Sequence, residues 1–475
     1  MNRLRYLLPA LLLLGVVVAP PASATAPVWS AGDISVPSLY SVANGQVTLL
    51  SCLSAGNCLA GGWFYTYAND GVHTFLERED GRNWSNAISV PDNSGGFNFE
   101  VNGLTCATTE CIGVGSNSLG AQIVHYSWSS QSVESFPVTF ANQSLNTTHS
   151  SLKDVACTSD GNCVAGGYVN VTAGANSSAL LVDSETNGSW GNAVTVPLPS
   201  TAGANPGVNP GQVGCISSSR CVYIGSFNTR EGQMRPFIAI RQNGTWLNAI
   251  SPQMPSNAAS MGSQSLSEIS CVAGGTCTAA GSYHTTAGTL VPFSVTITAN
   301  SIDAGVQIPL PANAAPSPKA FLFGFHGLDC SSTGNCSLGA QYSYQVNGVT
   351  RFGGFLTSEV NGVWNPRSQS TFMQVPPSAA SAGQFGGVVG MSCWSSGNCV
   401  GAVAYVDSLQ NYFVGVDVES NGVWAQVTGV SMPSNLPAGA AGGLYALRCF
   451  SANACSGVGS YQNGSRIMPF HLNSN

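Results

Sequence analysis

The chain has 475 residues and a formal net charge of −7, and only 7% of its residues are Asp, Glu, Lys or Arg. Its hydrophobic residues, 44% of the chain, can fill a sizeable core, which excludes a disordered chain. Its 14 Lys and Arg residues are too sparse for a surface that binds nucleic acid. With 56 glycines and so few charges, the composition favours many short strands joined by polar turns.

The N-terminus has the pattern of an export signal. Arg3 and Arg5 precede the apolar run LLPALLLLGVVVA, and the small residues ASA follow at 22–24. This order predicts a signal peptide over 1–24 that is cleaved after Ala24. Cleavage after Ala26 is the alternative, although Pro27 disfavours it. We therefore expect a secreted protein, extracellular or in the periplasm or cell envelope, with no membrane span. Its residues 25–475 are expected to form a single domain in a compartment that permits disulfides.

All 16 cysteines fall into close pairs, and the pairs mark a repeat. Seven pairs enclose five residues and one pair encloses four, and the first cysteines recur every 51 to 63 residues. Self-similarity at such a period indicates a repeat architecture. The eight pairs are Cys52 and Cys58, Cys106 and Cys111, Cys157 and Cys163, Cys215 and Cys221, Cys271 and Cys277, Cys330 and Cys336, Cys393 and Cys399, and Cys449 and Cys455.

Each repeat is predicted to form four short strands, here named a, b, c and d. A strand-like run such as QVTLLS at 46–51 precedes the first cysteine, and an apolar run such as VAGGYV at 164–169 follows the second. A third apolar run comes next, and several repeats continue with Asn-Gly-x-Trp, as in NGSW at 187–190. Asn-Gly favours a two-residue hairpin because both positions tolerate positive φ. The cysteines therefore close the a–b hairpin, and Asn-Gly turns strand c into strand d.

Cysteines on either side of a tight hairpin loop occupy facing strand positions, within reach of a disulfide. We predict a disulfide within each pair, closing a loop of about seven residues and contributing roughly 2–2.5 kcal/mol. Zinc binding is the alternative, but zinc ribbons need two pairs with tighter spacing that meet in space.

Repeats of four strands and this length predict an all-β protein, an eight-bladed β-propeller with one blade for each cysteine pair. The last repeat ends after three strands, and PVWSAGDISVP at 27–37 resembles the d-strand phrase NWSNAISVP at 83–91. The N-terminal strand is therefore predicted to complete the last blade and close the ring. A seven-bladed ring with an irregular insertion is the alternative, because the repeat that begins with Cys106 lacks Asn-Gly-x-Trp.

Two propeller families are similar at the level of the repeat. DGRNW at 80–84 and the Asn-Gly-x-Trp turns resemble eroded Asp-box hairpins of sialidase-like propellers. The double glycines at 61–62 and 166–167, with Tyr168 and Trp190 downstream, more weakly resemble Kelch repeats. The phrase C-S/T-x-x-G-N-C is similar to cysteine-paired repeats of exported bacterial proteins. The resemblance covers nearly all of 25–475 and implies the propeller fold without an activity, since propellers host many functions.

The sequence does not show the residues with which either family performs catalysis. A sialidase needs converging arginines, a Tyr–Glu pair and a further acid, and its Arg-Ile-Pro phrase is absent. A copper oxidase of the Kelch kind needs a free cysteine and histidine ligands. Every cysteine here has a close partner, and the six histidines show no short ligand spacing. We therefore expect no cofactor and no metal site.

Two groups of side chains are the candidate binding residues. In six repeats an aromatic residue stands six positions after the second cysteine, and strand alternation puts it on the face of that cysteine. Packing between blades is the commoner role of such residues. The functional alternative is a ring of aromatics that stacks on sugars, with arginines on the same rim. The candidates are Phe64, Phe227, Tyr283, Tyr342, Tyr405, Tyr461, Arg230, Arg235 and Arg351.

The long d–a connections lie at the same end of the ring as the b–c loops, and loops on a rigid scaffold are a common place for binding. We expect an exported, non-catalytic, monomeric propeller that binds a glycan or an extracellular protein through this end. A glycan-active hydrolase or lyase of sialidase-like architecture is the first alternative, and a structural, envelope-associated propeller is the second. Two acidic residues that converge on the central pocket would favour the enzyme.

Overall fold

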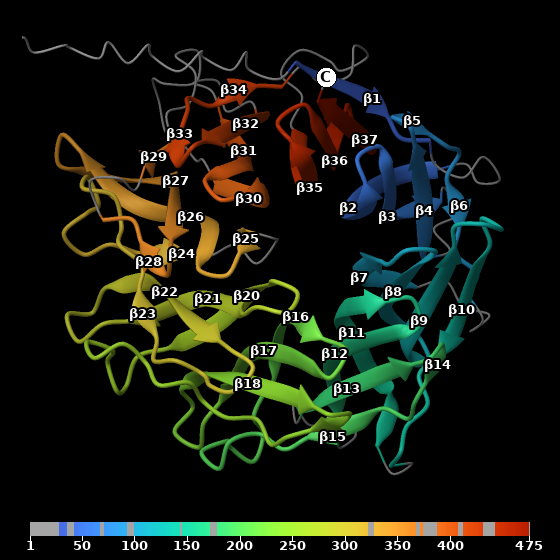
Figure 1. The fold of residues 1–475 in the computed structure, drawn as a ribbon, viewed down its shortest axis with the longest axis horizontal. Helices are drawn as coiled ribbons and strands as arrows, with labels where there is room; N and C mark the ends of the chain where they lie inside the picture. Colours follow the sequence, from blue (N-terminus) through green and yellow to red (C-terminus); the bar gives the residue numbers. More distant parts are fainter. Residues whose placement is uncertain are drawn as a thin grey trace, which may run out of the picture.

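The computed structural model describes residues 28–35, 42–66, 71–92, 99–142, 145–171, 178–321, 327–366, 371–373, 387–406, 412–430 and 442–474. Within these ranges the strands form eight separate antiparallel sheets arranged in a ring (Figure 1). The chain is an eight-bladed β-propeller. Over the same ranges, no helix is long and apolar enough to cross a membrane.

The first four blades follow the first four cysteine pairs along the chain. Blade 1 contains β2 (Val42–Ser54), β3 (Asn57–Thr66), β4 (Val72–Asp80), β5 (Asn83–Trp84) and β6 (Ile88–Ser89). Blade 2 contains β7 (Glu100–Cys106), β8 (Glu110–Asn117), β9 (Gly120–Ser127) and β10 (Val133–Pro137). Blade 3 contains β11 (Asn146–Ser159), β12 (Asn162–Asn170), β13 (Ser178–Thr186), β14 (Ser189–Trp190) and β15 (Val194–Val196). Blade 4 contains β16 (Asn209–Ser217), β17 (Arg220–Asn228), β18 (Met234–Gln242) and β19 (Thr245–Trp246).

The last four blades complete the circle. Blade 5 contains β20 (Gln264–Cys271), β21 (Cys277–His284), β22 (Leu290–Ile297) and β23 (Val306–Gln307). Blade 6 contains β24 (Ala320–Phe321), β25 (Leu328–Ser332), β26 (Asn335–Val346), β27 (Val349–Val360), β28 (Val363–Trp364) and β29 (Thr371–Phe372). Blade 7 contains β30 (Gly387–Ser395), β31 (Asn398–Val406), β32 (Tyr412–Ser420), β33 (Val423–Trp424) and β34 (Thr428–Gly429). Blade 8 contains β35 (Gly442–Ser451), β36 (Ala454–Asn463), β37 (Arg466–Ser474) and β1 (Trp29–Asp33).

The predicted order of strands within a repeat is confirmed. Strand a lies next to the centre of the ring, and strands b, c and d follow outward (Figure 1). Each strand a touches the strand a of the next blade, as β2 touches β7 and β30 touches β35. In several blades strand d is split into two short pieces that both pair with strand c, as β5 and β6 do with β4. Blade 2 has its own strand d, β10, so the seven-bladed alternative is wrong.

The ring is closed by the N-terminal strand, as the sequence predicts. β1 pairs with β37 over five residues, from Trp29 opposite Ser474 to Asp33 opposite Phe470. Trp29 is 7% exposed and packs in one cluster with Leu444 and Leu472. The two ends of the described chain are therefore part of one blade, which makes the closure a feature of the core.

All eight predicted disulfides are present, so the zinc alternative is wrong. In blade 3, the paired cysteines face one another across β11 and β12, with their Cα atoms 4.0 Å apart. No free cysteine is found in the described ranges. Each bridge thus fixes the register of an a–b hairpin whose glycines and serines would hold it weakly. The bridges join Cys52 to Cys58, Cys106 to Cys111, Cys157 to Cys163, Cys215 to Cys221, Cys271 to Cys277, Cys330 to Cys336, Cys393 to Cys399 and Cys449 to Cys455.

The repeated phrase Ser-x-Gly-Asn-Cys forms a clasp between the two hairpins of a blade. In blade 6, the carbonyl of Gly334 accepts a hydrogen bond of 2.8 Å from the amide of Gly362 in the c–d turn. Asn335 Nδ2 donates to Ser332 Oγ at 3.0 Å, and its Oδ1 accepts from the Asn361 amide at 3.2 Å. A Cβ on Gly334, whose φ is 69°, would lie 2.7 Å from the Gly362 nitrogen, so glycine is required there. The same glycine pairing recurs as Gly81 with Gly56, Gly188 with Gly161 and Gly422 with Gly397.

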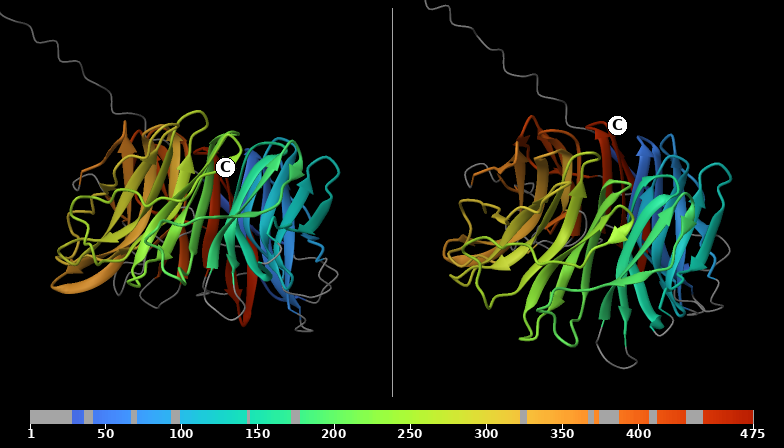
Figure 2. Two further views of the ribbon diagram at one scale, coloured as in Figure 1. Left: turned by 90° about the horizontal axis from the view of Figure 1, so that it is seen from below. Right: turned by 60° about the horizontal axis from the view of Figure 1, so that its bottom comes forward.

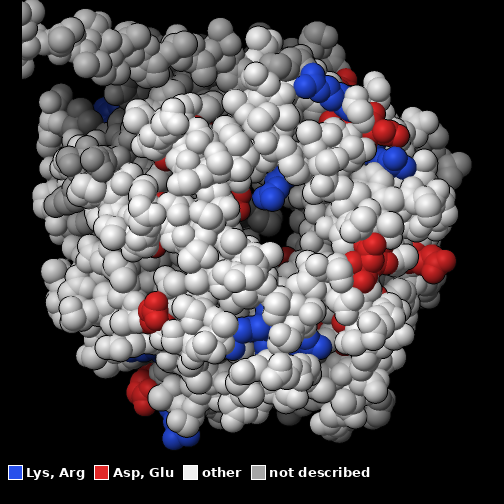
Figure 3. Space-filling model, in the orientation of Figure 1, with Lys and Arg blue, Asp and Glu red and all other residues white. Residues whose placement is uncertain are grey.

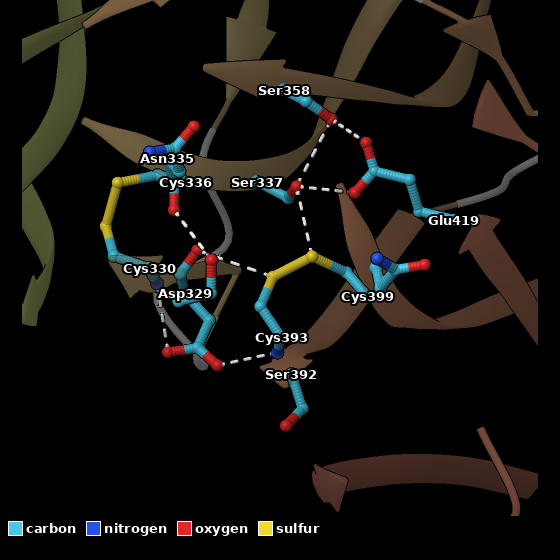
Figure 4. The surroundings of a disulfide bond; sticks show 12 residues. Asp329, Cys330, Asn335, Cys336, Ser337, Ser358, Ser392, Cys393, Cys399 and Glu419 are labelled. Atoms are coloured by element: carbon cyan, nitrogen blue, oxygen red, sulfur yellow. Dashed lines mark hydrogen bonds between the residues drawn. A yellow bond between two sulfur atoms is a disulfide. The ribbon is translucent and has the colours of Figure 1, made fainter. Parts of the chain in front are cut away.

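Neighbouring blades are joined beside the disulfides (Figure 4). Asp329, which precedes the first cysteine of blade 6, accepts a 2.8 Å hydrogen bond from the amide of Cys393 in blade 7. Glu419 of blade 7 reaches back and accepts from Ser337 Oγ at 2.9 Å and Ser358 Oγ at 2.5 Å. Burial raises the pKa of Glu419, while these two hydroxyls lower it. In three further junctions a serine hydroxyl accepts the hydrogen bond from the cysteine amide of the next blade, as Asp329 does. The pairs are Ser51 with Cys106, Ser270 with Cys330 and Ser392 with Cys449.

Candidate functional site

The six candidate aromatics lie inside the blades. Their exposed fractions run from 0% for Phe64 to 5% for Tyr405. Four of them pack on a buried phenylalanine of strand c, with ring centroids 5.5 Å apart for Tyr283 and Phe293. The burial fits the packing role and leaves no ring face for a sugar in this conformation, because side chains on the face of the disulfide point between blades. The six residues are Phe64, Phe227, Tyr283, Tyr342, Tyr405 and Tyr461.

The three candidate arginines are spread over two blades and do not meet. Arg230 is exposed in the b–c loop of blade 4 and donates to the carbonyl of Ser200 at 3.1 Å. Arg235, half-buried on β18, donates to the carbonyl of Gly262 at 2.5 Å. Arg351 lies on β27 of blade 6. None of the three belongs to the described lining of the central cavity.

The innermost strand carries a β-bulge at the same place in blade after blade. On β11, Leu152 pairs with Gly167 and Asp154 pairs with Gly166, which leaves Lys153 as an extra, unpaired residue. A bulge re-aims the extra side chain and is common beside binding sites. The extra residue stands four positions before the first cysteine; in blade 4 the two residues Gly211 and Gln212 lie opposite the single residue Ile224. The others are Thr48, Asn102, Ser267, Val389 and Tyr445. In blade 6 this position is His326, outside the described residues.

A glycine on strand b makes room for each of six bulges. Gly167 stands four positions after the second cysteine of its blade, and a Cβ there would lie 2.0 Å from the carbonyl oxygen of Ser151. The corresponding distance is 1.8 Å between Gly281 and the Ser265 carbonyl. The other glycines at this position are Gly62, Gly115, Gly225 and Gly459. In these six blades the glycine leaves room for the carbonyl of the bulged strand, whereas blade 7 forms its bulge at Val389 with Val403 at this position.

The bulge residues face a central cavity of about 1120 Å³. Every bulge residue named above except Val389 belongs to its described lining. The hollow at the centre of the ring is visible in Figure 3, where most of the atoms around it are neither acidic nor basic. The lining includes the start of strand a and the end of strand b, such as Glu100 on β7 and Trp63 on β3. The strands run between the two faces of the ring (Figure 2), so these lining residues lie toward the face opposite the disulfide hairpins, here called the cavity face.

Four aromatic side chains line the cavity, and none of them is among the candidate residues predicted from the sequence. They are Trp63 and Tyr65 of blade 1, Tyr168 of blade 3 and Tyr445 of blade 8. Trp63 and Tyr65 meet edge to face, with ring centroids 5.2 Å apart. Trp63 and Tyr65 flank the buried Phe64, and strand alternation sends the flanking rings to the opposite face. The aromatic position that lines the cavity is therefore five residues after the second cysteine, as in Trp63 and Tyr168.

The charged groups of the cavity gather in blades 2 and 3. Lys153 Nζ donates to Asn102 Oδ1 at 3.4 Å and lies 5.9 Å from the ring centroid of Tyr168. Burial lowers the pKa of Lys153, and the nearby charge of Glu100 raises it. Asp154 accepts a 2.7 Å hydrogen bond from the Val213 amide of blade 4, and burial raises its pKa to about 7. No group of three His, Cys, Asp or Glu side chains that could hold a metal ion is found in the described ranges.

Some positions carry the same residue in most blades, whereas the bulge position differs from blade to blade. The cysteines recur in all eight blades and the glycine on strand b in six of them, because these blades share the same local backbone. The bulge position instead carries Thr48, Asn102, Lys153, Ser267 and Tyr445, which differ in size, charge and hydrogen-bonding capacity. Equivalent backbone with different side chains places a mixed set of chemical groups around one cavity, which suits the recognition of an asymmetric ligand.

Comparison with known proteins finds a likeness in fold and assigns no activity. No family model and no curated protein matches this chain. The structure is similar to the Dos1 propeller, at 8% identity over 94% of each chain and a TM-score of 0.48. It is also similar to a PL25 ulvan lyase, at 9% identity over 90% of this chain and 94% of that one, with a TM-score of 0.42. A neuraminidase-like protein of subtype N11 from A/flat-faced bat/Peru/033/2010 (H18N11) is 9% identical over 73% of this chain and 97% of that one, with a TM-score of 0.37. These likenesses concern the propeller fold alone.

Proposed function

We propose that this protein binds a glycan in the central cavity, through the bulge residues of the innermost strands and the aromatic rings beside them. The observation that carries the proposal is the lining itself, which combines Trp63, Tyr65, Tyr168 and Tyr445 with amide and hydroxyl side chains. Sugars present apolar C–H faces that pack on aromatic rings and hydroxyls that bond to amides, so they match such a wall. A cavity of about 1120 Å³ is large enough for more than one sugar ring.

We further propose that the protein is exported and monomeric. Eight disulfides in one chain support folding in an oxidising compartment, since cytosolic proteins rarely keep structural disulfides. The predicted signal peptide over 1–24 lies outside the described residues. An extracellular protein is the alternative ligand at the cavity face. A structural, envelope-associated role without a ligand is the remaining alternative.

One observation favours a second candidate, a glycan-active hydrolase or lyase. Asp154 has a pKa raised to about 7, and Lys153 has a lowered pKa, in the same wall of the cavity. Groups with a pKa moved toward neutrality can serve as general acid and base. Asp154, however, accepts the Val213 amide of the next blade, so its position also has a structural reason.

The experiment is a glycan and polysaccharide array probed with the mature protein, followed by calorimetry and product analysis on each hit. Trp63→Ala and Tyr168→Ala are each expected to weaken binding by roughly 2- to 10-fold, the range for one lost aromatic contact. Phe450→Ala is the matched control, because Phe450 is an exposed aromatic on β35, five residues beyond Tyr445 and outside the described lining. Shortened or unsaturated products would favour the enzyme. Equal loss of binding in the control, or no loss in either cavity variant, would reject the proposed site.

A further inference from the structure

Two Asn-Gly-Val turns in blade 6 share one sequence and one backbone shape but have different surroundings. Asn347 and Gly348 join β26 to β27 with φ angles of 50° and 78°. Asn361 and Gly362 join β27 to β28 with φ angles of 51° and 81°. Both are two-residue hairpin turns, because the residues on either side of each turn pair with one another. Any chemical difference between the two asparagines therefore comes from their contacts.

Only the second turn is held by the clasp. The Gly362 amide donates to the Gly334 carbonyl at 2.8 Å, and the Asn361 amide donates to Asn335 Oδ1 at 3.2 Å. The first turn is exposed, and the amide of Gly348 makes no hydrogen bond within the described part of the chain. The Gly348 nitrogen thus has no hydrogen bond within the described part of the chain that must open before it can react.

An Asn-Gly sequence contains its own nucleophile. The glycine backbone nitrogen loses its proton and attacks Cγ of the asparagine side chain, a new N–C bond forms, and the side-chain nitrogen leaves as ammonia. Water then opens the cyclic imide at either carbonyl and gives aspartate or isoaspartate. The step requires the glycine N–H to be released and turned toward Cγ, so a hydrogen bond that holds this group slows the reaction.

We infer that Asn347 is a site of spontaneous deamidation in the folded protein, and that the clasp protects Asn361. Each event adds one carboxylate to the b–c turn of blade 6. Because the b–c turns lie at the end of the ring opposite the disulfide hairpins, the new charge appears on the cavity face. The inference does not depend on what the cavity binds.

The sequence provides a clean assay. Arg351 separates the two turns, so trypsin puts Asn347 in the peptide 320–351 and Asn361 in the peptide 352–367. The mature, disulfide-intact protein is incubated at mildly alkaline pH, then reduced, digested and analysed for the mass gain of an amide-to-acid conversion, with fragmentation to locate it. We expect Asn347 to convert faster than Asn361, on the order of tenfold, since the hydrogen bond from the Gly362 amide to the Gly334 carbonyl must open before Asn361 can react.

The controls separate the clasp from the local sequence. In denaturant with reductant, the two identical tripeptides should convert at similar rates, and unequal rates there would overturn the inference. Asn347→Gln should abolish conversion in its peptide, because glutamine would have to form a larger ring. Asn335→Ala should raise the rate at Asn361 and leave Asn347 unchanged. Equal rates in the folded wild-type protein, or faster conversion at Asn361, would refute protection by the clasp.

Discussion

Closure of the ring by β1 predicts that a single tryptophan near the N-terminus stabilises the whole propeller. Trp29 is 7% exposed and packs with Leu444 and Leu472, whereas the preceding residue, Val28, is 67% exposed. Truncation of a buried aromatic ring costs about 3–5 kcal/mol, so Trp29→Ala should destabilise the mature protein by that amount. The urea midpoint should then fall by on the order of 1 M, given the slopes usual for proteins of this size or smaller.

The matched control for this variant is Val28→Ala, which should leave the midpoint unchanged. Deletion of residues 25–38 should have a larger effect than Trp29→Ala, because it also exposes the edge of β37 from Phe470 to Ser474. An exposed edge strand invites pairing with another chain, so the deletion variant should aggregate at lower temperature. Equal midpoints for the wild type and Trp29→Ala would show that β1 contributes nothing to the ring and would refute the closure.

Three further predictions concern the blades. Burial raises the pKa of Glu77 to about 9, so the folded state holds a proton that the unfolded state releases near its ordinary pKa of about 4.5. The contribution of Glu77 to the free energy of unfolding is complete below that value and is lost as pH rises toward 9. Glu77→Gln should therefore reduce the fall in the unfolding midpoint between about pH 5 and pH 8. An equal fall in the wild type and the variant would contradict this. Gly161→Ala should destabilise blade 3 by about 1–3 kcal/mol in urea unfolding, because φ is 68° and the new Cβ would meet the Gly188 nitrogen at 2.5 Å; a neutral result would mean that the clasp does not hold. The double change Cys393→Ser and Cys399→Ser should cost about 2.4 kcal/mol by loop closure, and a cost near zero would show that the hairpin keeps its register without the bridge.

The repeat made most of the fold predictable from the sequence. Cysteines that recur in pairs fixed the a–b hairpins, and Asn-Gly fixed the c–d turns, because both depend on local chemistry. The closure by Trp29 was predictable because its phrase matches the strands that carry Trp84 and Trp190. The fourth strand of blade 2 was not predictable, because β10 follows Trp128 without an Asn-Gly turn. Only its pairing with β9 shows that β10 is strand d.

The site was harder to predict because the sequence does not say which face of strand b lines the cavity or where strand a bulges. The position six residues after the second cysteine was predicted as the candidate, which selects Phe64. The cavity is lined by its neighbours Trp63 and Tyr65. A signal for the bulge is present in the sequence, as a glycine four positions after the second cysteine in six repeats. Lys153 stands four positions before its cysteine and belongs to the ring of bulge residues, but nothing in the sequence alone shows that this position is unpaired.

The most direct test of the glycan proposal is a crystal structure of the mature protein with the tightest-binding oligosaccharide from the array. We expect sugar density in the central cavity, with at least one ring packed on Trp63 or Tyr168 and hydrogen bonds to bulge residues such as Asn102. Sugar bound on the outer surface of the blades, or at the face of the disulfide hairpins with the cavity unoccupied, would contradict it.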